Sequence, residues 1–138
     1  MPDASELIAS VERGDAAAVR SLLRAGMSAD TERASLDMSW LDNRHHHHGA
    51  APVLVLAASL GFTDVVAALL EHGAPVDAAA YVWEHPHVTV DYELPYPLMT
   101  ALMAAAYRGH EDVVRALLLA GADPLLQLDD RRSALDVA

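Results

Sequence analysis

The stretch TALMAAAYRGHEDVVRALLLAGADP, residues 100–124, carries the pattern that decides the fold. Its first part is a short apolar segment that ends at Gly109, and its second part repeats apolar residues at helical spacing before it ends at Gly121. Glycine readily closes a helix because it adopts the left-handed backbone conformation without a steric penalty. The stretch therefore predicts two short helices joined by a tight turn and closed by a glycine.

Two earlier segments repeat this pattern. In each copy a second glycine follows the first after twelve residues, and the unit opens nine residues before its first glycine. These openings lie at Ser5, Pro52 and Thr100, and a fourth opening, SALDVA, begins at Ser133. The matching segments are GDAAAVRSLLRAGM at 14–27, GFTDVVAALLEHGA at 61–74 and GHEDVVRALLLAGA at 109–122.

This unit resembles the ankyrin repeat, and the resemblance covers nearly the whole chain. The family's TPLH tetrapeptide is degraded in every copy, which reads SELI, PVLV, TALM and SALD. The resemblance implies an all-α solenoid, in which helix pairs stack because one pair alone cannot bury its apolar face. We expect one domain over residues 1–138, with complete repeats near 5–29, 52–76 and 100–126 and a partial repeat near 133–138.

The partial repeat begins an inner helix with no outer helix after it, so the last complete repeat is expected to be poorly covered. This predicts either a truncated chain or another chain on that end, including self-association through a second copy.

The spacing of the units predicts two insertions. Thr100 and Ser133 are 33 residues apart, whereas Ser5 and Pro52 are 47 apart and Pro52 and Thr100 are 48 apart. The surplus falls near residues 30–51 and 77–98, where the resemblance implies β-hairpin loops beside a concave face. We therefore expect two enlarged, neighbouring hairpins, which can meet in a small sheet.

The strands of these hairpins are predicted from alternating residues. In the second insertion, residues 88–94 alternate apolar and polar side chains, and Tyr81 to Trp83 precede them as the other strand. In the first insertion, residues 35–40 alternate, residues 41–44 form the turn and the histidines at 45–48 form a weaker returning strand.

Most of the unusual chemistry lies in these insertions. They contain five of the seven aromatic residues, six of the eight histidines and a net charge of −6 out of the total of −11. His72 and His110 lie outside them, at positions where ankyrin repeats often have histidine, and are interpreted as structural. The candidate residues for binding a partner or ligand are Trp40, His45, His47, Tyr81, Trp83, His85, His87, Asp91, Tyr92 and Glu93.

Composition excludes several classes of function. There is no cysteine or lysine, which removes thiolate and Schiff-base chemistry and the lysine of a phosphate-binding P-loop. The acidic charge argues against nucleic acid as a partner. No apolar stretch approaches the ~20 residues of a membrane span, and no leader opens the chain, so a cytoplasmic protein without a membrane partner is expected.

The leading interpretation is a non-catalytic binding module, without a cofactor, that presents a concave face and the two hairpins to a protein with a basic or apolar surface. One alternative is a small-molecule pocket under the hairpins, with acid–base catalysis by a histidine and one of four acids. Another is transition-metal binding by the loop histidines, because imidazoles two residues apart on a strand suit zinc, copper or nickel. The four acids are Asp37, Asp42, Asp91 and Glu93.

Overall fold

The computed structural model of the chain describes residues 4–37, 48–83 and 96–126. Over these ranges, pairs of helices alternate with pairs of strands. The helices are α1 (Ala4–Arg13), α2 (Ala16–Arg24), α3 (Val53–Leu60), α4 (Thr63–Glu71), α5 (Ala101–Arg108) and α6 (Glu111–Leu119). The strands are β1 (Glu32–Asp37), β2 (His48–Pro52), β3 (Ala79–Trp83) and β4 (Tyr96–Thr100). Of the helices described, none has the length and apolar character needed to span a membrane.

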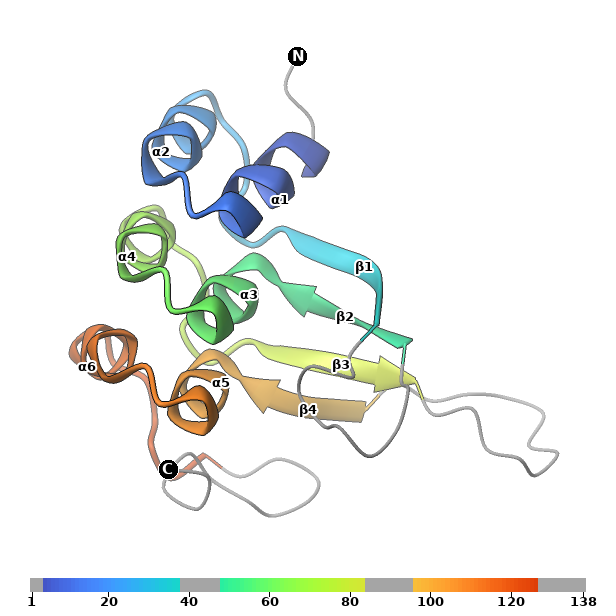
Figure 1. The fold of residues 1–138 in the computed structure, drawn as a ribbon, viewed down its shortest axis with the longest axis vertical. Helices are drawn as coiled ribbons and strands as arrows, with labels where there is room; N and C mark the ends of the chain where they lie inside the picture. The colour runs from blue at the N-terminus through green and yellow to red at the C-terminus, as the bar shows by residue number, and fades with distance from the viewer. Residues whose placement is uncertain (1–3, 38–47, 84–95, 127–138) are drawn as a thin grey trace, which may run out of the picture.

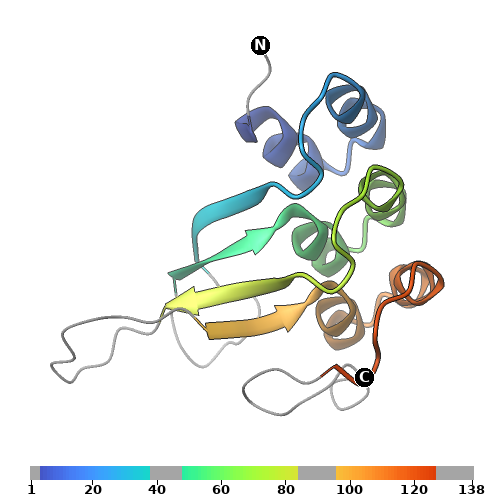
Figure 2. The same ribbon diagram turned by 180° about the vertical axis from the view of Figure 1, so that it is seen from behind.

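The three helix pairs stack in parallel layers (Figures 1 and 2). The first helices of the pairs, α1, α3 and α5, contact one another in that order and are called the inner helices. The second helices, α2, α4 and α6, contact one another in the same way and are called the outer helices. In both views the inner helices lie between the outer helices and the sheet.

Local signals explain where each inner helix stops and where α5 begins. The three inner helices are followed by Gly14, Gly61 and Gly109, whose φ angles are +71°, +78° and +75°. A side chain would be strained in this left-handed conformation, so glycine ends each helix and starts the turn. Thr100 caps the start of α5, because its hydroxyl oxygen accepts a hydrogen bond from the Met103 backbone N–H at 3.3 Å.

The core follows the inner helices through the stack. Helix α3 lies between α1 and α5, and its residues 53–59 are all buried. Helix α5 buries its first five residues, three of which are alanine, and these small side chains allow close helix packing. The outer helix α4 buries mainly one face, formed by Val65, Val66, Ala68 and Leu69. Stacking, rather than any single pair, therefore supplies the buried apolar surface.

The four strands form one antiparallel sheet in the order β1-β2-β3-β4. Within the first insertion, Asp37 pairs with His48, and within the second, Val82 pairs with Tyr96. The two insertions meet where β2 pairs with β3, with His48 opposite Trp83. The ends of both insertions are thus strands of a single sheet that projects from the inner helices (Figure 1).

Some expected elements differ or lie elsewhere. Helix α1 begins at Ala4, so Ser5 lies inside the helix instead of before it. Strand β2 begins at His48, and of the expected histidine strand the residues 45–47 lie outside the described residues. The expected turn at 41–44, the expected strand at 88–94 and the partial repeat at 133–138 also lie outside them.

Candidate functional site

The three inner helices end side by side, and each exposes residues that directly precede its closing glycine. Because α1 packs on α3 and α3 packs on α5, these helix ends form one line across the three repeats. We call the exposed residues of this line the end row. Its members are Glu12, Arg13, Leu60, Tyr107 and Arg108.

The middle of the end row is apolar. The exposed fraction is 46 % for Leu60 and 50 % for Tyr107, whereas Ser59, directly before Leu60, is buried. A single exposed apolar side chain is ordinary on a protein surface. Leu60 and Tyr107 are two such side chains on adjacent inner helices, with Arg13 at one end of the line and Arg108 at the other. Tyrosine and arginine are enriched in protein interfaces.

Ring contacts between repeats cover two of the three helix ends in the end row, those of α1 and α3. The Phe62 ring lies against Gly14, so that a β carbon added there would stand 2.9 Å from the ring. The His110 ring lies against Gly61 in the same way, with 2.8 Å to an added β carbon. His110 Nε2 also donates a hydrogen bond to the Ser59 carbonyl oxygen, at 2.9 Å. The structural interpretation of His110 is thus supported, since its ring packs between two repeats.

The sheet continues into the inner helices without a linker. Pro52 is the last residue of β2 and the cap of α3, and Thr100 is the last residue of β4 and the cap of α5. The Val53 backbone N–H also donates to the Thr31 carbonyl oxygen at 2.9 Å, which joins the start of α3 to the residue before β1. Strands β2 and β4 therefore lead directly into α3 and α5.

The structure describes the backbone of only two of the ten residues predicted as the site. Tyr81 and Trp83 lie on β3, between β2 and β4, and pair with Ala50 and His48. The other eight lie outside the described residues, so their predicted roles remain predictions. They are Trp40, His45, His47, His85, His87, Asp91, Tyr92 and Glu93.

The acids proposed for the alternative functions fall mostly outside the described ranges as well. Asp42, Asp91 and Glu93 are outside them, and Asp37 lies at the end of β1. Within the described residues, no three histidine, aspartate or glutamate side chains gather into a group that could hold a metal ion. His72, the residue that caps the end of α4, is exposed.

The outer face carries charge rather than apolar surface between the first two repeats. Arg20 on α2 forms a hydrogen-bonded ion pair with Glu71 on α4. The hydrogen bond from Arg20 holds the pKa of the Glu71 carboxyl below its usual value, and the nearby positive charge acts in the same direction. Both side chains are substantially exposed to solvent, so the pair stabilises the stack only weakly.

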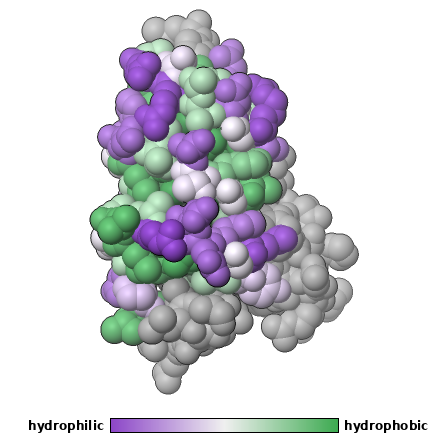
Figure 3. All heavy atoms as spheres, turned by 60° about the vertical axis from the view of Figure 1, so that its left-hand side comes forward, coloured by the Kyte–Doolittle hydropathy of each residue, from purple (hydrophilic) through white to green (hydrophobic). Residues whose placement is uncertain are grey.

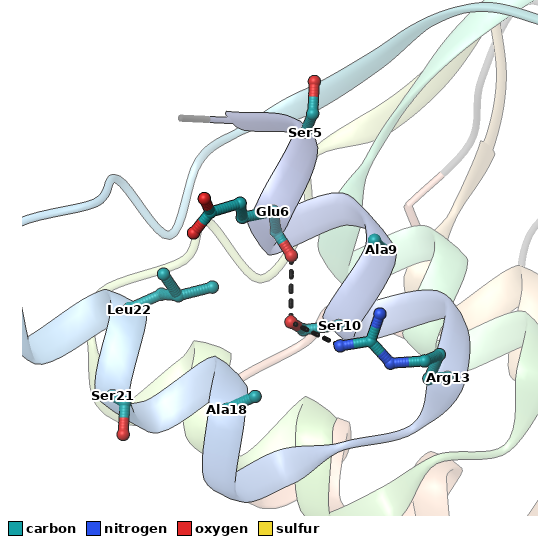
Figure 4. Close-up of a pocket in the computed structure, with 8 residues that line it drawn as sticks. All are labelled: Ser5, Glu6, Ala9, Ser10, Arg13, Ala18, Ser21 and Leu22. Atoms are coloured by element: carbon teal, nitrogen blue, oxygen red, sulfur yellow. Dashed lines mark hydrogen bonds between the residues drawn. The ribbon is translucent and has the colours of Figure 1, made fainter. Parts of the chain in front are cut away.

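One pocket lined entirely by described residues opens between α1 and α2 in the first repeat (Figure 4). It has a volume of about 530 Å³ and is open to solvent. Ser10 lies at its base, where its hydroxyl donates to the Glu6 carbonyl oxygen at 2.9 Å and accepts from Arg13 Nη2 at 3.4 Å. Ser10 is thus satisfied within the helix.

A solenoid of stacked helix pairs, with a sheet along its inner side and an exposed row at the inner helix ends, defines the class of protein. The chain belongs to the ankyrin repeat family, because the family model described as "Ankyrin repeats (3 copies)" matches residues 7–128. This confirms the fold and the family predicted from the glycine pattern. Ankyrin repeats generally mediate protein–protein interaction, which agrees with a binding module.

Two longer plant proteins are similar in sequence. The chain is 30 % identical over 132 residues to "Putative E3 ubiquitin-protein ligase XBAT35" of Arabidopsis thaliana, a match that covers 96 % of this chain and 23 % of that protein. It is 30 % identical over 128 residues to "Probable E3 ubiquitin-protein ligase XBOS34" of Oryza sativa subsp. japonica, covering 93 % of this chain and 20 % of that protein. The chain therefore spans about a quarter or less of the length of these relatives.

The end row was not among the residues predicted from the sequence. A signal for it does exist, because each inner helix closes at a glycine and the residue directly before that glycine is Arg13, Leu60 or Arg108. Arginine at this position is typical of a helix end in solvent, whereas leucine is not. The predicted site lies in the insertions instead, because their residue types are unusual, whereas the residue types of the repeats are ordinary.

Proposed function

We propose that this chain is a protein-binding module whose contact surface consists of the end row together with the sheet formed by the two insertions. The observation that carries the proposal is the exposure of Leu60 and Tyr107 on neighbouring inner helices. Their burial by a partner would remove apolar surface from water, at about 25 cal/mol per Å². The rings of Phe62 and His110 pack on the glycines that end α1 and α3, so little ordering of the backbone is required at those two helix ends.

The chemistry of the surface indicates the chemistry of the partner. The centre of the end row favours apolar residues on the partner, and Arg13 and Arg108 favour carboxylates at the two ends of the contact. The insertions carry a net charge of −6 and favour basic residues where the partner meets the sheet. We therefore propose a partner surface with an apolar centre and charges of both signs around it.

The predicted aromatic and acidic residues of the insertions extend this proposal. Tyr81 and Trp83 lie on β3, in the middle of the sheet, and Trp40, Tyr92 and Asp91 belong to the segments that the strands lead into. Aromatic side chains contribute a large share of the binding energy in many interfaces. Support for this part comes from residue type and from position along the sheet.

A capture experiment with matched variants tests the proposal. The double variant Leu60→Ser with Tyr107→Ser is compared with Leu119→Ser, which removes a more exposed leucine, at 84 %, from the outer helix α6. Each protein is immobilised in the same amount in an extract of the source cells, and captured proteins are quantified by mass spectrometry. The proteins captured by the unmodified chain should fall about tenfold or more with the double variant and remain with Leu119→Ser. Equal capture by both variants would place the contact elsewhere.

A further inference from the structure

The third helix pair, at one end of the stack, presents a groove of about 520 Å³. Figure 3 shows hydrophobic surface gathered at this end of the outer face, whereas hydrophilic residues predominate at the opposite end, over α2. We call this surface the end groove, and none of the residues that line it belongs to the end row. Its lining residues are Ala106, Gly109, Glu111, Val114, Arg115 and Leu118.

The apolar residues of the end groove are of a kind that the stack buries elsewhere. Counted from the closing glycine of the inner helix, Ala106 corresponds to Ala58 and Val114 to Val66. Both residues of the second repeat are fully buried. In the third repeat, Ala106 and Val114 are only partly buried, and Leu118 is 43 % exposed. The end groove therefore offers apolar surface to a further molecule.

Gly109 leaves space for a side chain in the end groove. The Phe62 ring lies against Gly14 and the His110 ring against Gly61, each less than 3 Å from where a β carbon would stand. Gly109 has a similar backbone conformation, with a φ of +75°, but no atom of the described residues lies within 4 Å of that position. A side chain from another molecule can therefore reach the Gly109 backbone as the two rings reach the other glycines.

The part of α6 that lines the end groove carries opposite charges one helical turn apart. Glu111 and Arg115 are both exposed, and Leu118 follows three residues after Arg115. Residues at these spacings lie on one face of a helix. Arg115 Nη1 lies 3.5 Å from Asp112 Oδ1 in the same helix, but the Arg115 side chain is 70 % exposed and keeps donors for a second carboxylate. This face of α6 is therefore complementary in charge to an antiparallel copy of itself.

The antiparallel register that pairs these charges also fills the space at Gly109. A second copy of α6, aligned so that its Arg115 lies opposite Glu111, extends three residues further to its Leu118. Gly109 lies two residues before Glu111, on the same side of this pairing. The leucine of the second copy thus arrives beside the uncovered glycine of the first. The match works in both directions, because a two-fold axis makes each contact twice.

The opposite end of the stack does not match the end groove. The surface between α1 and α2 includes Glu6 and Ser21, which are both exposed. The equivalent residues of the second repeat, counted from the closing glycine, are Val53 and Ala68, which are fully buried. Covering a polar surface with an apolar one costs free energy unless the polar groups find partners. A contact between two copies is therefore favoured between like ends and disfavoured head to tail.

We propose that the end groove is a dimer interface, occupied by the end groove of a second copy with the two α6 helices antiparallel. Leu118 of each copy covers Gly109 of the other, and Glu111 of each copy pairs with Arg115 of the other. The Val114 side chains of the two copies meet near the two-fold axis. One helix and one turn of each copy form a small contact, so the dimer is reversible and forms in the micromolar range.

Sedimentation velocity of the full chain, from micromolar to near-millimolar concentration, tests the proposal with two charge reversals. Glu111→Arg places two arginines opposite each other in both halves of the contact, and Arg115→Glu places two acids there. Each variant alone should raise the dissociation constant of the dimer about tenfold or more. An equimolar mixture of the two variants should recover the dimer, because every arginine of one variant then faces a glutamate of the other.

Asp64→Arg is the matched control. It makes the same change of charge in the first turn of α4, outside the end groove, and should dimerise as the unmodified chain does. Circular dichroism of each variant establishes that the helices remain folded. An unmodified chain that stays monomeric over the whole concentration range would overturn the proposal. A dimer that persists in both single variants, or that fails to return in their mixture, would overturn it as well.

Discussion

His110 Nε2 lies 2.9 Å from the carbonyl oxygen of Ser59, so a side chain of the third repeat satisfies the last turn of the inner helix of the second. The carbonyl can only accept, so Nε2 carries the proton in this bond. The same ring fills the space above Gly61, where a β carbon would clash at 2.8 Å. One histidine therefore contributes both packing and a hydrogen bond to the joint between repeats. Its hydrogen-bond acceptor, Ser59, directly precedes Leu60 in the chain.

Replacing this histidine should weaken the joint. His110→Ala leaves the Ser59 carbonyl without its side-chain donor and opens a space over Gly61, so we expect a loss of about 1–3 kcal/mol in the free energy of unfolding. Chemical denaturation followed by circular dichroism measures it. His72→Ala is the matched control, since His72 is exposed at the end of α4, and it should change stability by less than about 0.5 kcal/mol. Similar losses in the two variants would show that the His110 contacts add nothing to stability.

The glycines give a second, independent test of the joint. Gly61→Ala and Gly73→Ala both force a side chain into a left-handed conformation, with φ angles of +78° and +89°. That strain alone costs about 1–2 kcal/mol. Of the two, Gly61→Ala also meets the His110 ring, whereas no atom of the described residues lies within 4 Å of a β carbon added at Gly73. Denaturation should therefore show a larger loss for Gly61→Ala, and a larger loss for Gly73→Ala would contradict the close contact.

The ion pair between Arg20 and Glu71 predicts that the stability of the folded protein depends on pH in the acidic range. Arg20 holds the pKa of Glu71 below its ordinary value, so near that value the folded protein binds fewer protons than the unfolded chain. The stabilisation is therefore complete above the ordinary pKa of Glu71 and is lost as the pH falls through the lowered folded-state pKa.

Thermal unfolding measured between about pH 6 and pH 3 checks this sign. Arg20→Met should lower the unfolding temperature slightly at the upper end of this range and converge with the unmodified chain at the lower end. Salt at about 0.5 M should shrink the difference at the upper end, since both side chains are exposed and screened. A difference that grows as the pH falls would contradict the assignment.

The fold was predictable from the sequence because its signals are local. A glycine twelve residues after another, with apolar residues at helical spacing between them, specifies a helix and its closure within one segment. Thr100 shows the same locality, since its position alone marks the start of α5 and its hydroxyl does cap that helix. The pairing of His48 with Trp83 is different, because it joins two insertions that are far apart in the chain. Such a register depends on how the repeats stack and not on either insertion alone.

The site was harder to predict for a related reason. Exposure of Tyr107 is a property of the assembled stack, and Ser59, its counterpart one repeat earlier, is buried. Unusual residue types pointed to the insertions and made Tyr81 and Trp83 candidates. Both residues lie on β3, one of the two central strands of the sheet. Leu60 was not distinguishable from a core residue by hydropathy alone. Its exposure becomes visible only once the inner helix ends are placed in line.

The most direct test of the account is site-specific photo-crosslinking from the end row. A photoreactive phenylalanine replaces Tyr107 in one protein and Leu119 in another, and each is irradiated in an extract of the source cells. Position 107 should yield a protein crosslink that an excess of unmodified chain competes away, and position 119 should yield none that is competed. A competed crosslink at position 119, with none at position 107, would contradict the claim that the inner helix ends form the binding surface.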